Sequence, residues 1–418
     1  MNLAKVTGKL KAQIKIFSGK VSEGLPKVAG RFVEEMLYGI ESEQSVHLSK
    51  IARCLSERIP LIKTINRLSY QLSRDGLWEK ITARLLDLAR HEIGKDTLLI
   101  LDLSDIKKSY AKRMEYLGRV HDGSAGELVD GYCTCNVIAS ELGRSEVIPL
   151  YCRLYSHLAP DCTGENHEIF KAMDTVSKAV NNRGIWVIDR GADRRVIFDH
   201  LLSRNRRFII RLRGDRYVID GKKNIIAADL AQKYVPPYSQ TLIWEEKDKE
   251  TAYDISFGFR RVYLPDVPLP LGLVVVKGFG EKPMMLLTNL PLRKNRKLLL
   301  RIVKSYITRW VIEETIRFIK QSYKLEDIRV QTYTRLQNMM ALACAAAYFT
   351  AVHIGGKIKL VTLSAIIIKA SKRIFGVSTF RYYAIADGIK ELLSQSKTGP
   401  YRPDPPWIPK NQIKLFET

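Results

Sequence analysis

The sequence predicts a mixed protein of helices and strands, α+β or α/β in class, with a strand-rich centre between two helical regions. Residues 1–92 carry the apolar spacing of helices and few strand signals. From residue 97, short runs of aliphatic and β-branched residues alternate with turn residues, and helical spacing returns near residue 294. With 418 residues, 46% of them hydrophobic, the chain can form two to four domains with packed cores.

Strand and helix segments follow a regular order between residues 97 and 213. We expect strands at 97–103, 132–140 and 147–155, a helix at 165–180, a strand ending at Asp189, a helix at 192–203 and a strand at 207–213. Three strands, helix, strand, helix, strand is the order of a ribonuclease-H-like fold. In that fold the first strand lies beside the strand that ends at Asp189. Asp102 could therefore meet Asp189, although 87 positions separate them.

The predicted segments divide the chain into five parts. Residues 1–92 are helical, 93–213 form the first part of the core, and 214–293 form a β-rich insertion. The insertion is expected because the 124 positions from Asp189 to Glu313 are too many for a loop and contain five strand-like runs. Residues 294–330 carry the helix with Glu313, and 331–418 form a helical region with a proline-rich tail.

Two aspartates follow apolar runs that are typical of buried strands. Asp102 comes after Leu98–Leu101, and Asp189 comes after Ile185–Ile188. An ionised carboxylate there costs several kcal/mol unless a cation compensates it, which a metal ion would do. The alternative is that each aspartate caps the segment that follows. Asp105 is a rival for the first position, but it begins a polar segment, whereas Asp102 continues the buried run.

Residues 306–320 are predicted to form a helix with one polar face. At about 100° per residue, Tyr306, Arg309, Glu313 and Lys320 lie at roughly 0°, 300°, 340° and 320°, while Glu314 lies roughly 80° off that line. A carboxylate beside Arg, Lys and a phenol suits a phosphodiester bound through divalent metal. The alternative is a solvated face with an ordinary Arg309–Glu313 pair. Together with the two aspartates, Glu313 makes a three-carboxylate set suited to two Mg²⁺ or Mn²⁺ ions about 3.5–4 Å apart.

This spacing resembles the Tyr-x2-Arg-x3-Glu-x6-Lys signature of the DDE transposases of bacterial insertion sequences, family four, a cut-and-paste group with a β-strand insertion. The resemblance covers roughly residues 95–350 and includes the Arg309-Trp310 and Glu313-Glu314 pairs. It implies that the catalytic metal ligands are Asp102, Asp189 and Glu313. It also implies a group of side chains that position DNA near the cut: Tyr306, Arg309, Lys320 and, by stacking on an unstacked base, Trp310.

The resemblance further implies an enzyme that cleaves DNA at the element's ends and transfers the strands into target DNA. The partners would be double-stranded DNA, both terminal inverted repeats and target, and a second copy of the chain in a homodimer on the DNA. Residues 1–92 would recognise the ends. Two alternatives stay open: a metal-dependent, ribonuclease-H-like nuclease without strand transfer, and a domesticated, non-catalytic DNA-binding protein. A membrane-surface or RNA-binding protein would fit the charge but not the spacings.

The charge agrees with a polyanionic partner. The chain has 68 Lys and Arg against 44 Asp and Glu, a formal charge of +24. Five lysines among apolar residues in the first 20 positions predict either an amphipathic membrane-surface helix or, as we prefer, a basic DNA-contacting arm.

The remaining patterns argue against a membrane protein or a zinc protein. No window reaches 18 apolar residues, so the longest candidate, 339–352, is expected to be a buried helix. The six cysteines have no zinc-site spacing. We expect reduced thiols, no membrane partner and a location in the bacterial cytoplasm, associated with the nucleoid.

Overall fold

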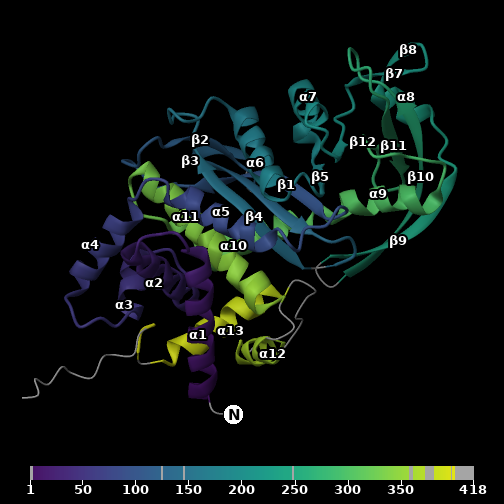
Figure 1. The fold of residues 1–418 in the computed structure, drawn as a ribbon. Coiled ribbons are helices and arrows are strands. Elements are labelled where there is room, and N and C mark those ends of the chain that lie inside the picture. The colour runs from purple at the N-terminus through teal and green to yellow at the C-terminus, as the bar shows by residue number, and fades with distance from the viewer. Residues whose placement is uncertain are drawn as a thin grey trace, which may run out of the picture.

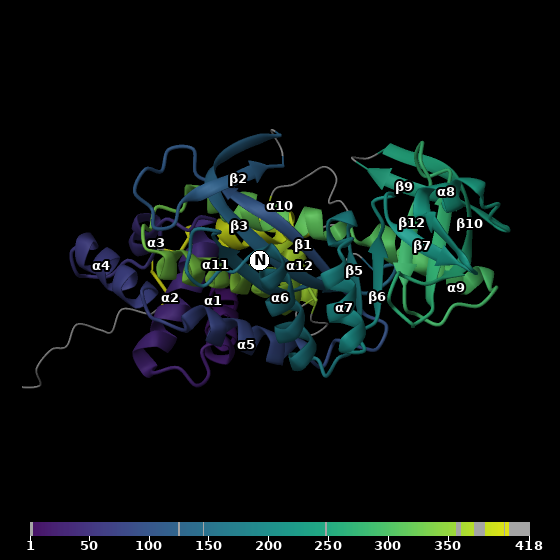
Figure 2. The ribbon, with the colours of Figure 1, turned by 90° about the horizontal axis from the view of Figure 1, so that it is seen from above.

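The computed structural model describes residues 3–123, 126–144, 146–246, 249–356, 361–371, 381–396 and 398–400. The protein is mixed α/β, with helices around one large mixed sheet. A helical body lies at one end, the core of the sheet in the middle and the strands of residues 214–293 at the other end (Figure 1). The view from above shows the same row of three parts (Figure 2).

The middle of the sheet contains the strands predicted for the core. β1 (Leu98–Lys107) lies between β3 (Glu127–Ser140), to which it is antiparallel, and β5 (Ile185–Ile188), to which it is parallel. β6 (Phe208–Arg211) continues parallel to β5, and β4 (Val147–Tyr155) and the short β2 (Gly118–Asp122) pair with β3. Leu98–Leu101 and Ile185–Ile188 are fully buried, as expected of strands covered on both faces.

Helices on the sheet follow the predicted order. α6 (Glu165–Ala179) packs against β3 and β4, and α7 (Arg195–Ser203) packs against α6. A single 3₁₀ turn, η1 (Arg190–Ala192), separates β5 from α7. The helix predicted to start at residue 192 therefore starts three residues later.

The N-terminal and C-terminal helical regions form one body rather than two. It contains α1 (Leu3–Val21), α2 (Lys27–Glu43), α3 (Leu48–Cys54), α4 (Leu61–Leu72), α5 (Leu77–Ala89), α11 (Tyr333–Tyr348), the π-helix η3 (Phe349–Ile354), α12 (Val361–Ala370) and α13 (Tyr382–Ser394). The Thr7 hydroxyl donates to the Leu392 carbonyl at 3.2 Å, and Phe17 stacks on Tyr348 with ring centroids 5.8 Å apart. α5 and α11 also pack against β4, which joins this body to the sheet.

The segment predicted as a basic N-terminal arm does not extend from the body as an arm, and contact of its lysines with DNA stays a prediction. α1 is a packed helix whose apolar side chains, Val6, Leu10, Ile14, Phe17 and Val21, are all buried. The same packing leaves no apolar face for a membrane surface, because that face is already covered by protein. Of the proline-rich tail, residues 401–418 lie outside the described part of the chain.

The β-rich insertion is not a separate sheet. It begins with a hairpin of β7 (Tyr217–Asp220) and β8 (Lys223–Ile226) and a short helix, α8 (Ala227–Lys233). β9 (Tyr238–Glu246), β10 (Lys249–Val262), β11 (Leu271–Lys277) and β12 (Met284–Thr288) follow as an antiparallel series. β12 pairs with β6, with Leu286 opposite Arg211, so one sheet of ten strands runs through core and insertion. The insertion thereby covers the edge of β6, which would otherwise present unpaired backbone groups.

The predicted signature helix is broken in two. α9 (Arg296–Thr308) begins at Asn295, whose side chain accepts from the Leu298 N–H, and α10 (Val311–Ser322) ends before the 3₁₀ turn η2 (Leu325–Asp327). At the junction the Glu313 N–H donates to the Trp310 carbonyl at 3.1 Å, a three-residue spacing. Because both junction residues keep right-handed helical angles, the chain continues in nearly the same direction.

Within the described ranges, no helix combines the length and apolar character that crossing a bilayer requires. The predicted apolar segment at 339–352 lies in α11 and η3, and nearly all of it is buried against protein.

Candidate active site

Asp102 and Asp189 lie side by side on two parallel strands. The last registered pair of β1 and β5 is Leu101 with Ile188, and each aspartate is the next residue along its strand. The Asp189 carboxylate accepts from the Gly191 N–H at 2.7 Å through Oδ1, so this aspartate does cap the turn that follows. The cap uses one oxygen and leaves the other for a further partner.

Asp102 lies in the middle of its strand, not at the end. β1 runs on to Lys107 because β3 keeps pairing with it, Asp105 with Cys133 and Lys107 with Gly131. The predicted strand is therefore too short. The Asp102 side chain is 21% exposed, and its Oδ1 accepts from the Leu103 N–H at 3.0 Å.

The pKa of the Asp102 carboxyl depends on its burial and on the charged groups around it. Burial raises the pKa of the Asp102 carboxyl to about 7. The Arg309 guanidinium opposes this shift, while the negative charges of Asp189 and Glu313 add to it. The three predicted carboxylates are thus near enough to influence one another electrostatically.

Arg309 joins two of the three carboxylates. Its Nη2 donates to Glu313 Oε1 at 2.7 Å, and its Nη1 lies 3.4 Å from Asp102 Oδ2. The side chain is 8% exposed, and its buried Nε donates to no described residue. The Arg309–Glu313 pair expected of a solvated helix face is therefore half inside the protein, because the turn between α9 and α10 directs Arg309 toward β1.

The carboxylates do not yet form a metal-ligand cluster. Among the described residues, no group of three or more His, Cys, Asp or Glu side chains is placed to hold a metal ion. The donor chemistry still fits, since three carboxylates are the hard oxygen ligands of Mg²⁺ and Mn²⁺. The Arg309 guanidinium now supplies the positive charge that a metal ion would supply. Binding of metal by all three therefore requires Arg309 to leave Asp102 and Glu313.

Tyr306 lies against Arg309, and Trp310 follows Arg309 in the chain. The Tyr306 ring is buried and lies 5.8 Å from the Arg309 guanidinium carbon. Burial raises the pKa of the Tyr306 phenol, although Arg309 and Arg211 beside it act in the other direction. Trp310 is 36% exposed, and its ring centroid lies 6.2 Å from that of Phe279, which belongs to the insertion. Trp310 is thus neither a fully buried core residue nor a free surface one.

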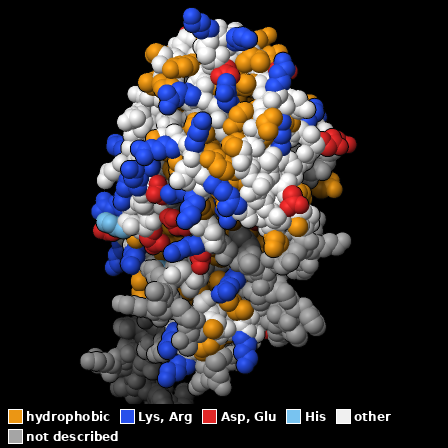
Figure 3. All heavy atoms as spheres, turned by 90° about the vertical axis from the view of Figure 1, so that its right-hand side faces the viewer, with side chains coloured by type: hydrophobic (Ala, Val, Ile, Leu, Met, Phe, Trp, Pro, Cys, Tyr) orange, Lys and Arg blue, Asp and Glu red, His pale blue; other side chains and the backbone are white. Residues whose placement is uncertain are grey.

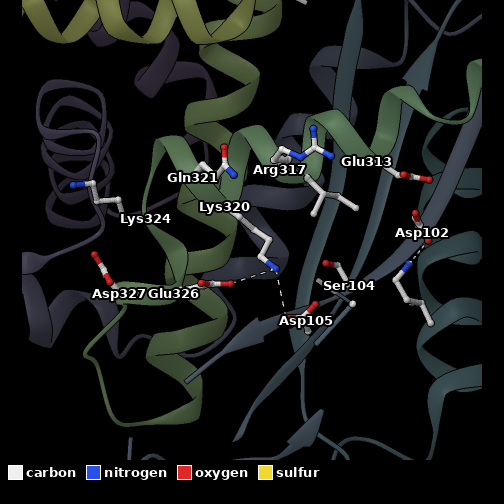
Figure 4. Close-up of a pocket in the computed structure, with 13 residues that line it drawn as sticks. Asp102, Ser104, Asp105, Glu313, Arg317, Lys320, Gln321, Lys324, Glu326 and Asp327 are labelled. Atoms are coloured by element: carbon white, nitrogen blue, oxygen red, sulfur yellow. Dashed lines mark hydrogen bonds and ion pairs between the residues drawn. The ribbon is translucent and has the colours of Figure 1, made fainter. Parts of the chain in front are cut away.

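Lys320 lies apart from the carboxylates of Asp102, Asp189 and Glu313, about two turns after Glu313 along α10. Its Nζ lies 3.5 Å from Asp105 Oδ2 and 3.4 Å from Glu326 Oε1 (Figure 4). These residues line a trench of about 750 Å³ that has Asp102 and Glu313 at one end and Lys324 and Asp327 at the other. Lys320 is therefore part of the same trench, held by two acidic side chains in its middle.

Sequence reasoning missed two contributors to the trench. The sequence indicates Asp105 only as a rival for Asp102, whereas it faces the trench as the partner of Lys320. Strict alternation along β1 places Asp102 and Asp105 on opposite faces, so no local pattern indicated that both line the trench. Glu326 lies in η2, whose position no local pattern indicated.

Adjacent carboxylates on two interior strands, a buried guanidinium and an open trench lined by both acidic and basic side chains are features that suit phosphoryl transfer on a long polyanion. Residues 158–349, a little under half of the chain, match the family model described as the transposase DDE domain. The match includes Asp189 and Glu313, and β1 with Asp102 precedes it. The chain therefore carries a transposase DDE domain and is a polynucleotidyl transferase that catalyses DNA transposition. Enzymes of this class typically use divalent metal ions.

Comparison with solved structures and curated proteins adds little to the match with the family model. The chain is similar to the piggyBac transposase in its synaptic complex with hairpin DNA, with a TM-score of 0.44 and 12% identity, over 92% of this chain and 78% of that one. At this level the likeness carries no conclusion about the site. Among curated proteins, none matches the sequence significantly.

Proposed function

We propose that this transposase acts by cut-and-paste on a bacterial insertion sequence of family four, with Asp102, Asp189 and Glu313 as its catalytic metal ligands. The observation that carries the proposal is the Arg309 guanidinium, which contacts both Asp102 and Glu313 next to the strand end that bears Asp189. The buried Arg309 guanidinium shows that the carboxylates of Asp102 and Glu313 need a positive charge beside them. The core would be ribonuclease-H-like, since β4, β3, β1, β5 and β6 have the strand order and directions of that fold.

The site would hold two Mg²⁺ or Mn²⁺ ions, which activate a water and stabilise the leaving 3′ oxygen. Asp102, Asp189 and Glu313 would bind these ions. In the cleavage step, the water oxygen bonds to phosphorus and the bond from phosphorus to the 3′ oxygen breaks. The freed 3′ hydroxyl then attacks a phosphorus of target DNA in the same way, with no covalent bond between protein and DNA.

The cationic side chains would position DNA phosphates. Once displaced from Asp102 and Glu313, Arg309 can grip phosphate oxygens through two N–H groups at once. The Tyr306 ring, 5.8 Å from the Arg309 guanidinium carbon, would restrict the orientation of the Arg309 side chain. Lys320 would contact a phosphate further along the trench, and Trp310 would stack on a base at the cut, beside Phe279.

The DNA partners would be the element's terminal inverted repeats and the target, held by a homodimer in the bacterial cytoplasm. Lys and Arg side chains are spread over the end of the molecule that carries the insertion, with fewer Asp and Glu (Figure 3). We assign recognition of the ends to residues 1–92. There, α4 exposes Ile62 and Tyr70 beside the exposed Lys63.

Substitution tests the metal-ligand assignment. Asp102→Ala, Asp189→Ala and Glu313→Ala should each abolish cleavage of an end duplex while leaving end binding intact. Glu314→Ala is the matched control, because the Glu314 side chain pairs with Arg317 and does not line the trench. Cleavage by any of the first three would remove that residue from the set. Pre-cut ends incubated with a target plasmid distinguish strand transfer from a nuclease that only cuts.

A further inference from the structure

The trench of the active site continues into a second hollow. This groove has a volume of about 550 Å³ and lies between residues 108–114, which follow β1, and residues 326–331, which include the end of η2 and the segment after it. Glu326 and Asp327 line both the trench and the groove. The two hollows are therefore neighbours, with Glu326 and Asp327 between them.

The walls of the groove are fixed by their own contacts. The buried Lys108 ammonium donates to the Glu326 carbonyl at 2.5 Å and to the Ile328 carbonyl at 2.7 Å. On the same loop, the Glu115 carboxylate accepts from the Tyr333 N–H at 2.6 Å, and the Glu115 N–H donates to the Gln331 carbonyl. Cross-links of this kind hold the two segments together before any ligand binds, so the shape of the groove is preorganised.

The exposed side chains of the groove suit a nucleic acid. Tyr110 is 98% exposed, although a tyrosine ring is usually at least partly covered. Lys112, Arg113 and Arg329 are exposed around it, and none of them forms an ion pair with a described residue. Of the two acidic residues, Glu326 pairs with Lys320, and Asp327 lies 3.9 Å from the His47 ring. Unpaired cations around an exposed aromatic ring are the features that hold a sugar-phosphate backbone.

We propose that this groove binds the backbone of the DNA duplex being cut, at a fixed distance from the scissile phosphate. Lys112, Arg113 and Arg329 contact phosphates there, and Tyr110 packs against a sugar or a base edge. The proposal rests on the proposed function, because it takes Asp102 as the cutting end of the trench. Asp102 to Lys107 spans about 17 Å along β1, at roughly 3.3 Å per residue. With about 3.4 Å of duplex per nucleotide, the groove contacts phosphates about five nucleotides from the cut.

The test measures binding of the full chain to an end duplex in a cleavage-dead Asp102→Ala background. The Lys112→Gln/Arg113→Gln variant should bind more weakly, and the slope of log affinity against log salt should decrease by about 1.8 in magnitude, about 0.9 for each phosphate that is no longer neutralised. A neutral methylphosphonate about five nucleotides from the scissile position should weaken the parent protein several-fold but not this variant. Tyr110→Ala should weaken binding without changing the slope, because it removes no charge.

The matched control is Lys222→Gln/Lys223→Gln, an equal change of charge at exposed positions of the β7–β8 hairpin. It should keep the parent's sensitivity to the methylphosphonate. The proposal is overturned if the groove variants keep that sensitivity and the parent slope, or if they weaken only target-plasmid binding. Cleavage by Asp102→Ala itself would instead overturn the proposed function, so the two failures are distinguishable.

Discussion

Replacing Arg309 by glutamine should make the free protein bind metal more tightly, even though it removes a side chain of the site. In the metal-free protein the Arg309 guanidinium neutralises Asp102 and Glu313 through contacts of 3.4 and 2.7 Å. A metal ion that uses these carboxylates must displace it. Arg309 therefore competes with metal until a DNA phosphate offers the guanidinium another partner.

The size of the effect follows from the two contacts. A hydrogen bond to a charged group contributes about 1.5–3 kcal/mol. The contact with Glu313 is short and well formed, whereas the contact with Asp102 is long, so we take about 2 kcal/mol for breaking both. That corresponds to roughly a 30-fold increase in Mn²⁺ affinity for Arg309→Gln.

Calorimetric titration of the DNA-free protein with Mn²⁺ at pH 8 checks this expectation, because Asp102 is mostly ionised above its pKa of about 7. Arg301→Gln is the control: Arg301 lies on α9, pairs with Asp96 at 3.0 Å and does not line the trench. It should leave the affinity unchanged. The reasoning is refuted if Arg309→Gln binds Mn²⁺ no more tightly than the parent, or if Arg301→Gln gives the same gain.

Three stability predictions concern buried charges away from the carboxylates. Burial raises the pKa of Glu41 from 4.5 to about 8, so stability should be full below pH 4.5 and decline by up to about 5 kcal/mol as pH rises through 8; Glu41→Gln should remove this decline in urea unfolding at pH 5 and 9. Glu168→Ala should cost about 3 kcal/mol, the lower end for breaking a buried pair, because Arg153 loses its partner at 3.2 Å but keeps Asp161 at 2.7 Å; Arg153→Met/Glu168→Leu should cost less. Lys108→Met should cost about 2–3 kcal/mol and speed amide exchange in residues 325–331, and unchanged exchange there would show that Lys108 does not fix the groove.

Local patterns predicted the elements of the core well. The apolar runs at Leu98–Leu101 and Ile185–Ile188 are buried strands, and the parallel pairing that brings Asp102 beside Asp189 follows from the order of the elements. Strand ends were predicted less well. β1 extends past its apolar run because β3 provides hydrogen-bond partners for polar residues, which no pattern within β1 can reveal.

The relations between distant segments could not be predicted. The amphipathic pattern of α1 is the same for a helix on a membrane surface and for a helix packed against protein. In the structure, α1 packs against the protein's own C-terminal helices. The insertion strands could form their own sheet or extend the core, and the choice depends on the free edge of β6. Both outcomes are decided by surfaces that lie far apart in the chain.

Helical spacing describes the signature segment only in part. It places Arg309 and Glu313 on one side, and the two side chains do pair. It assumes a continuous helix, however, and the tight turn at Arg309-Trp310 directs Arg309 inward toward Asp102. A helical wheel also cannot show that Lys320 has acidic partners of its own, Asp105 and Glu326.

The most direct test is anomalous diffraction from Mn²⁺ in crystals of the protein bound to a pre-cut end duplex. We expect Mn²⁺ within about 2.1 Å of carboxylate oxygens of Asp102, Asp189 and Glu313, with the Arg309 guanidinium moved from Asp102 onto a DNA phosphate. Manganese bound instead by Asp105, Glu326 and Asp327, or Arg309 still bridging Asp102 and Glu313 in the complex, would contradict the assignment.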